Sequence, residues 1–385
     1  MGRQKPFIIS AIAVTWLMVV LTSALGARAF WGINHFIFLP PWTIILSAIL
    51  AVVSIVWLLL GHGENTVSEP DSSQDQSLLG KPWQRALIAL VCIPFFVLLR
   101  SQTHFLGDGY GWLQIFGNGA GYYLKWTEFG SSWFVRQLEL LLGGFTNEHA
   151  LIVFQTLSVI SGAVVVYNVA SIVALLFEPK RARIVALVTL LVSGSALLWF
   201  GYVEFYPAFW AMATTFVHFS VLRLRRGGYA AWVILTFILS AFTHLQTIYL
   251  FPGLAYVLVV PHVSIERIKQ SRTPLMIAFS ALAVTALVVF FVLWFTRLNF
   301  ETIFLPLLKG RPASPHYAIL SPKHLFDIFN LFLLLFPGLI VLVAAALTIT
   351  KERVRDSTVL FLAVCSAGSL LFLLVIDPQI GMARD

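Results

Sequence analysis

The chain alternates long apolar runs with short polar breaks, and this alternation limits its fold more than any other feature. Of its 385 residues, 59% are hydrophobic and 11% are charged, which is more apolar surface than a soluble domain can bury. A helix needs about 20 apolar residues to cross a bilayer. The sequence therefore predicts an all-α polytopic membrane protein with about eleven transmembrane helices. We expect them near residues 7–27, 41–60, 84–101, 148–178, 183–203, 206–223, 230–243, 246–260, 274–296, 325–349 and 357–376.

The positions of the basic residues predict the orientation of these helices. If the N-terminus is cytoplasmic, sixteen of the 25 Lys and Arg residues lie in inner loops and nine in outer loops. Such an excess of positive charge in cytoplasmic loops is typical of membrane proteins. It also accounts for the net charge of +8 without a nucleic-acid partner. Cys92 and Cys365 lie inside apolar runs, which favours buried structural thiols.

Composition divides the chain into three parts. Residues 1–60 are predicted to form an N-terminal transmembrane hairpin, and the polar, Ser/Asp/Gln-rich residues 61–80 a flexible cytoplasmic linker. Residues 81–385 would form the main transmembrane core. Within its first large outer loop, apolar residues of 112–145 recur at helical spacing between polar ones. We therefore expect amphipathic helices in the membrane interface there.

Acidic and histidine residues of the core fall at predicted outer turns. Asp108 lies in the first outer loop, with a glycine on each side that leaves it on bare, mobile backbone. Glu204 lies in the next outer turn, and His244 in the polar break that follows. Basic residues Lys309 and Arg311 fall in a later outer loop, and Arg384 follows the last span. Turns distant in the sequence are therefore expected to meet on one face.

Each of these residues also has an ordinary structural interpretation. Asp108 is compatible with a solvated loop turn, and Glu204 with an interfacial ion pair. His244 is compatible with a hydrogen-bonded structural residue, although a polar break at membrane depth must line protein or a cavity. The basic residues Lys309 and Arg311 are compatible with solvated loop charges.

Short motifs at these turns resemble the GT-C superfamily of integral-membrane glycosyltransferases, in particular its bacterial members. The resemblance covers roughly residues 81–385. It rests on Gly107-Asp108-Gly109-Tyr110, the helices of 112–145, Tyr202-Val203-Glu204-Phe205-Tyr206-Pro207, Thr243-His244-Leu245 and Gly381-Met382-Ala383-Arg384-Asp385. Members of the superfamily use polyprenyl-phosphate-linked sugars on the extracytoplasmic side. The resemblance thus implies an enzyme of the bacterial inner membrane that passes such a sugar to a glycan, lipid or protein acceptor.

A role for each motif residue follows from that reaction. A carboxylate held against the acceptor hydroxyl would act as general base, with inversion at the anomeric carbon, and we assign this role to Asp108. Glu204, His244, Tyr110 and Tyr206 would bind the sugar or the acceptor. Cationic side chains suit the phosphate, which is the role expected of Lys309, Arg311 and Arg384.

The sequence departs from the superfamily in three respects. The acidic loop follows the third helix instead of the first, so residues 1–60 would be an N-terminal addition. The chain ends where members usually continue, which implies a truncated or split form. Gly107–Gly109 holds one carboxylate where many members have a pair, so no metal site is predicted, although hard ligands leave a divalent metal open.

Two other classes of protein remain alternatives. A transporter or flippase for a lipid-linked substrate would place ionisable residues near the bilayer midplane, whereas here they lie at helix ends. A non-catalytic membrane scaffold of the same fold is compatible with the single carboxylate.

Overall fold

In the computed structural model, all regular secondary structure of the described residues is helical. These are residues 4–25, 30, 32–33, 42–60, 79–104, 108–119, 126–191, 193–260, 318, 320–336, 338–346 and 356–375. Within these ranges there is no strand, which confirms the all-α prediction for them. The chain divides into a larger unit, residues 73–302 and 356–372, and a smaller unit, residues 1–72, 303–355 and 373–385.

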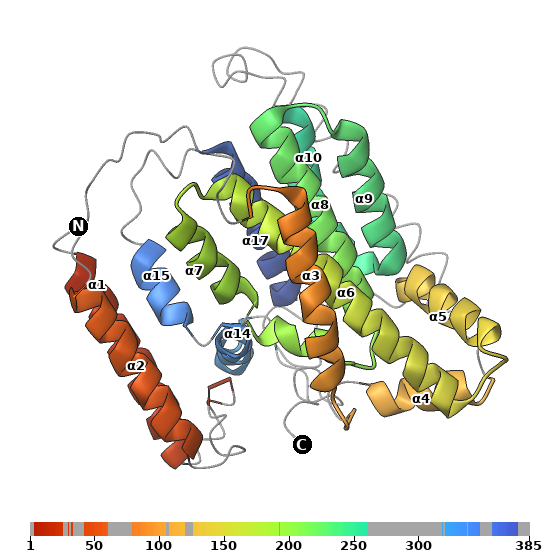
Figure 1. Ribbon diagram of the computed structural model, residues 1–385, viewed down its shortest axis with the longest axis horizontal. Coiled ribbons are helices and arrows are strands. Elements are labelled where there is room, and N and C mark those ends of the chain that lie inside the picture. Colours follow the sequence, from red (N-terminus) through yellow and green to blue (C-terminus); the bar gives the residue numbers. More distant parts are fainter. Residues whose placement is uncertain are drawn as a thin grey trace. The chain divides into compact units, whose positions relative to one another are not determined.

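A long central helix organises the larger unit. This helix, α6 (Asn147–Leu176), packs along both α3 (Pro82–Leu98) and α8 (Tyr206–Arg226). The next helix, α9 (Ala230–Thr243), packs on α8, and Figure 1 shows α6, α8 and α9 as neighbouring helices. Gly162 of α6 lets α3 approach closely, because a Cβ there would lie 2.9 Å from the Phe96 ring.

The predicted span at 183–203 is not one continuous helix. Instead, α7 (Lys180–Leu191) and the 3₁₀ helix η5 (Gly194–Trp199) share this run. Between them, the Ser193 hydroxyl donates to the Leu190 carbonyl at 2.9 Å and lies 2.6 Å from the Ser195 hydroxyl. Such local side-chain bonds compete with the helical hydrogen bonds of the backbone.

The outer loop predicted to be amphipathic contains two short helices. Both α4 (Gly109–Gly117) and α5 (Phe129–Leu141) pack against α6, beside its N-terminal half in Figure 1. Trp112 and Phe116 of α4 are buried in one cluster with Phe154 of α6. The expected helices are therefore confirmed, and their position in a membrane interface stays a prediction.

The last helices of the larger unit follow a break after α9. The 3₁₀ helix η6 (Leu245–Leu250) leads directly into α10 (Phe251–Val259). Phe361 of α17 (Ser357–Val375) is buried in the same apolar cluster as Val257 of α10.

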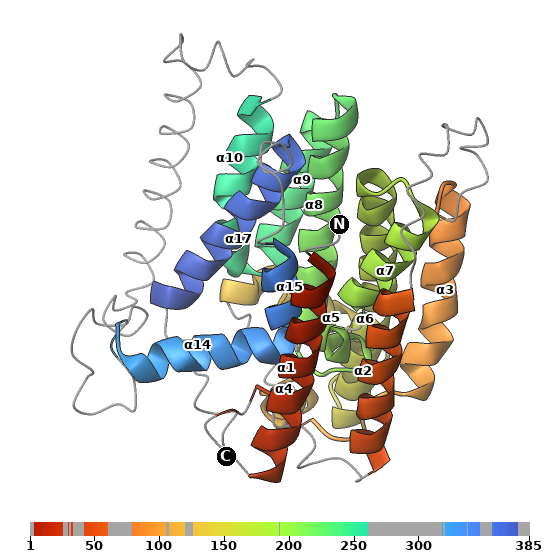
Figure 2. The same cartoon turned by 90° about the vertical axis from the view of Figure 1, so that its left-hand side faces the viewer.

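The smaller unit contains the N-terminal helices. Figure 2 shows α1 (Gln4–Ala24) beside α2 (Trp42–Leu60), and the Trp16 indole N–H donates to the Ser47 hydroxyl at 3.1 Å. In the same unit, α15 (Leu339–Ala346) packs on α1, and α14 (Pro322–Leu335) precedes it. The predicted span at 325–349 is thus shared by two helices. The predicted division at residues 61–80 stays a prediction, and residues 1–60 group with residues 303–355.

Within the described ranges, one helix is both long and apolar enough to cross a membrane. It is α6, with 30 residues and a mean hydropathy of 2.2 in its most apolar window. Seven further apolar helical segments of 10–17 residues lie within the described ranges. The eleven predicted spans therefore stay a prediction, and the span expected at 274–296 lies outside the described residues.

Candidate functional site

Asp108 stands immediately before α4 with its side chain exposed. The carbonyl of Asp108 accepts the Trp112 N–H at 2.9 Å, which begins the helix. The carboxylate does not cap the N–H groups of α4. It is therefore available to a ligand in solution.

Gly109 fixes this position by close packing. A Cβ on Gly109 would lie 2.8 Å from the His104 carbonyl oxygen and 3.2 Å from that of Val203. Only a residue without a side chain fits there without moving backbone. Gly107 lies outside the described residues. The expectation of bare, mobile backbone on both sides of Asp108 is thus wrong at Gly109, which is buried inside a helix.

A tight turn between η5 and α8 carries Glu204. Gly201 adopts a φ of +70°, a conformation that favours glycine. The Ser158 hydroxyl accepts the Tyr202 N–H at 3.0 Å. Val203 and Phe205 on either side are each 1% exposed. Since both neighbours are packed into the core, the Glu204 side chain is held in one direction.

Glu204 is buried against the start of α4. One carboxylate oxygen accepts the Asp108 backbone N–H at 2.8 Å, and the other accepts the Trp112 indole N–H at 2.9 Å. Burial raises the pKa of the Glu204 carboxyl to about 7, and the charges of Asp108 and Glu128 act in the same direction. The two hydrogen bonds oppose this effect, because they favour the charged form. Desolvation is the stronger influence, so Glu204 titrates near neutral pH.

His244 lies in the predicted polar break after α9 and is 3% exposed. Its ring stacks on Tyr206, with centroids 5.4 Å apart. The Gln246 backbone N–H donates to its Nδ1 at 3.2 Å, and its Nε2 lies 3.1 Å from Glu128 Oε1. Because Nδ1 accepts a hydrogen bond, the neutral ring carries its proton on Nε2, the nitrogen that lies 3.1 Å from Glu128 Oε1. The His244 ring in this polar break therefore contacts Glu128, Tyr206 and the Gln246 backbone.

Glu128 also belongs to this site, although the sequence did not predict it. It ends the 3₁₀ helix η4 (Trp126–Glu128), directly before α5, and is 5% exposed. The available signal was a second acidic residue in the same outer loop as Asp108. Two residues further on, Gly130 packs closely against Phe242 of α9, a tertiary contact that local sequence does not reveal.

Asp108, Glu128 and Glu204 form one electrostatic cluster, which we call the carboxylate cluster. Each of the three lies within electrostatic range of the Tyr206 hydroxyl. Within the described residues, no group of three or more His, Cys, Asp or Glu side chains is arranged to hold a metal ion. We therefore assign no ligand set to a metal.

The other predicted site residues lie further away or outside the described part. Tyr110 is 46% exposed, and its ring contacts that of His104 at a centroid distance of 5.6 Å. Lys309, Arg311 and Arg384 lie outside the described residues. The structure thus brings together Asp108, Glu204, His244 and Tyr206, and adds Glu128.

Comparison with known proteins gives no relative for this arrangement. No protein-family model, no curated protein and no solved structure matches the chain. The site must therefore be interpreted from its own geometry.

Proposed function

We propose that the chain is a polytopic membrane glycosyltransferase. It would move a sugar from a polyprenyl-phosphate donor to an acceptor hydroxyl on the extracytoplasmic face. The observation that carries this proposal is the carboxylate cluster, in which an exposed Asp108 is fixed through its backbone by a buried Glu204. A held but accessible carboxylate suits a general base, because geometry must be right before pKa matters.

Exposed apolar side chains support a membrane location. On α3, Leu90, Val91 and Leu98 are 60%, 62% and 80% exposed. On α9, Trp232 and Ile238 are 53% and 56% exposed. Contiguous apolar faces of this kind are rare on soluble monomers, whereas lipid would cover them.

The exposed faces of the short helices suit a lipid-borne donor. Trp133, Phe134 and Leu141 of α5 are 43%, 44% and 82% exposed. These side chains would lie at the membrane surface, in the same outer loop as Asp108. A polyprenyl chain could then remain in the bilayer while its phosphate-linked sugar reaches the carboxylate cluster.

The proposed reaction is a single displacement. The acceptor oxygen attacks the anomeric carbon as Asp108 takes the hydroxyl proton, and the bond from that carbon to the phosphate oxygen breaks. Polyprenyl phosphate leaves with the bonding electron pair, and the configuration inverts. Glu204 holds Asp108 in place, and Tyr206, which is 37% exposed and stacks on the buried His244, offers an aromatic surface to the sugar.

Cations would stabilise the leaving phosphate. Arg100 has its Cβ close to Gly201, so it lies beside the turn that carries Glu204. With Lys309, Arg311 and Arg384, it is a candidate to pair with phosphate oxygens.

The test measures two pools, the polyprenyl-phosphate sugar and the modified acceptor, in cells with and without the gene for this chain. Loss of a glycosyltransferase should leave the polyprenyl-phosphate sugar accumulated and its acceptor unmodified. Loss of a flippase should leave the lipid-linked sugar on the cytoplasmic side of the membrane. Periodate added outside intact spheroplasts, which does not cross the membrane, should then fail to oxidise that sugar. If neither pool changes, the proposed function is wrong and a scaffold is favoured.

A further inference from the structure

A second polar site lies at the opposite end of the larger unit from the carboxylate cluster. A cavity of about 460 Å³ opens between α6, α8 and the first turn of α3. The residues of α8 that line it include His218, which is about 18 Å along the helix from Tyr206, the first residue of α8, at 1.5 Å per residue. Cavities of this size hold small ligands. The proposed reaction uses none of its residues.

A chain of hydrogen bonds fixes the buried polar wall of the cavity. The Thr215 hydroxyl donates to the Ala211 carbonyl at 2.7 Å, so its oxygen accepts from the Asn168 amide nitrogen at 2.8 Å. The Asn168 amide oxygen therefore faces His218 Nδ1 at 3.0 Å and accepts a hydrogen bond from its N–H. Both Asn168 and His218 are more than nine-tenths buried, at 3% and 7% exposed.

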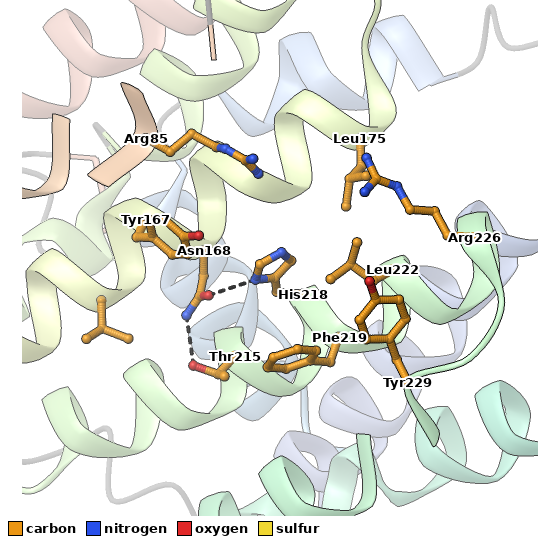
Figure 3. Close-up of a pocket in the computed structure, with 11 residues that line it drawn as sticks. Arg85, Tyr167, Asn168, Leu175, Thr215, His218, Phe219, Leu222, Arg226 and Tyr229 are labelled. Carbon is orange, nitrogen blue, oxygen red and sulfur yellow. Dashed lines mark hydrogen bonds between the residues drawn. The ribbon is translucent and has the colours of Figure 1, made fainter. Parts of the chain in front are cut away.

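This network leaves one atom of His218 for a ligand. In the neutral ring, Nε2 carries no proton and accepts a hydrogen bond. Figure 3 shows this side of the ring turned away from Asn168, toward the guanidinium group of Arg85. A ligand in the cavity would thus meet an acceptor beside a cation, which suits a hydroxyl next to an anionic group.

Two arginines supply positive charge, and neither has a carboxylate partner among the residues that the structure describes. Arg85 and Arg226 line the cavity from opposite sides (Figure 3), and they lie within electrostatic range of each other. Arg85 contacts the Lys81 carbonyl at 3.5 Å. No ion pair of either arginine occurs among the described residues. An anion between the two would relieve their repulsion.

Three nearby arginines have close partners within the protein. Arg225 pairs with Asp356 at 3.0 Å. Arg183 donates to the Phe177 carbonyl at 2.6 Å, and Arg223 to the Val257 carbonyl at 3.0 Å. Each of these three has a contact of 3.0 Å or less within the protein, whereas Arg85 has only the longer one of 3.5 Å to Lys81 among the described residues, and both Arg85 and Arg226 line the cavity.

The remaining walls are aromatic and aliphatic. Tyr167, Phe219, Leu222 and Tyr229 line the cavity beside the two arginines. We propose that this cavity binds the hydroxyl-bearing phosphate headgroup of an anionic phospholipid, between Arg85, Arg226 and His218. Guanidinium groups would pair with the phosphate oxygens, His218 would accept the hydroxyl, and the apolar wall would cover the start of the acyl chains.

The test measures lipid binding to the purified full chain by native mass spectrometry after delipidation. Phosphatidylglycerol should bind, and phosphatidylcholine should bind at least tenfold more weakly. R85Q and R226Q should each weaken phosphatidylglycerol binding about tenfold, a loss of about 1.4 kcal/mol for each. R225Q removes the same charge one residue away, outside the cavity, and should leave binding unchanged.

Two results would overturn the proposal. If R225Q weakens binding as much as R226Q, the lipid is attracted by general surface charge. If inorganic phosphate binds in an Arg85-dependent way while phosphatidylglycerol does not, the ligand is a free phosphate. Unchanged melting temperatures of R85Q, R225Q and R226Q would show that binding is compared between folded proteins.

Discussion

The carboxylate of Glu204 accepts the backbone N–H of Asp108 at 2.8 Å, although 96 positions separate the two residues in the chain. This contact holds the start of α4 against the turn before α8. It leaves the Asp108 carboxylate exposed and fixed at its backbone. A buried acid that positions an exposed one gives the proposed base a defined place.

The close packing of Gly109 should be essential to that place. Gly109→Ala would drive a Cβ to 2.8 Å from the His104 carbonyl oxygen, and we expect a loss of about 1–3 kcal/mol in the free energy of unfolding. Gly111→Ala is the matched control on the same helix, because a Cβ there meets nothing within 4 Å. It should be neutral or stabilise by up to about 1 kcal/mol, because alanine favours helix. Equal melting temperatures for both variants would contradict the packing.

Glu204 should give transfer activity an acid limb near neutral pH. Its pKa is about 7, and protonation below that value weakens its hold on the Asp108 N–H. We therefore expect kcat/KM to fall as pH falls through about 7, and Glu204→Gln to be less active without that limb. Trp112→Phe removes a hydrogen bond that lowers the pKa, so it should move the limb to higher pH. Trp133→Phe, at an exposed site on α5, should leave the limb in place. A limb that persists in Glu204→Gln would assign it to another group.

Glu139 should make the fold less stable as pH rises. The residue is 0% exposed, neither carboxylate oxygen has a hydrogen-bond partner among the described residues, and burial raises its pKa from 4.5 to about 7. The folded state thus binds a proton that the unfolded chain releases, and stability is lost as pH rises from 4.5 to above 7. Glu139→Gln cannot ionise, so it should be more stable than the wild type at pH ~8 by on the order of 2 kcal/mol, and equal at pH ~5.

The control for Glu139 is an exposed carboxylate on the next helix. Glu148 lies in the first turn of α6, where negative charge is favourable. Glu148→Gln should therefore give no stabilisation in thermal unfolding. If Glu139→Gln also fails to stabilise the protein at high pH, its carboxylate has a partner or is solvated.

The buried pair of His244 and Glu128 should be strongly coupled. The two side chains are 4% and 7% exposed, and removing either deletes the contact of 3.1 Å between His244 Nε2 and Glu128 Oε1. A double-mutant cycle of His244→Gln and Glu128→Gln should give a coupling of roughly 1–3 kcal/mol in unfolding free energy. The exposed pair of Arg225 and Asp356 is the reference, expected to couple by no more than about 1 kcal/mol. Comparable values for the two pairs would mean that His244 does not hold Glu128.

Periodicity and turn residues predicted much of the local structure. Apolar spacing identified α4 and α5, and the polar break at His244 separates α9 from η6 as expected. The expected meeting of the Asp108 and Glu204 turns is present as a hydrogen bond. The roles of these residues, and the membrane spans themselves, stay predictions.

Features that depend on tertiary contacts could not be predicted. Glu128 and Glu139 belong to the same polar loop, yet both are buried because of how α5 packs on neighbouring helices. Ser193 lies in an apolar run, and its hydroxyl donates a hydrogen bond to the Leu190 carbonyl where the helix is interrupted. Hydropathy does not predict such a bond. Which nitrogen of His218 carries the proton likewise depends on tertiary contacts, because the Thr215 hydroxyl of α8 orients the Asn168 amide of α6 that faces the ring.

The most direct test of the account is sugar transfer by Asp108→Asn. The purified chain would be given a polyprenyl-phosphate sugar and an acceptor, and transfer would be measured beside the wild type. Because the Asp108 side chain is exposed and caps no N–H group, the variant should keep its melting temperature. Loss of a general base typically costs about 10²–10⁴-fold in rate, so we predict a fall of at least about 100-fold. Full transfer activity in folded Asp108→Asn would contradict the assignment of Asp108 as the base.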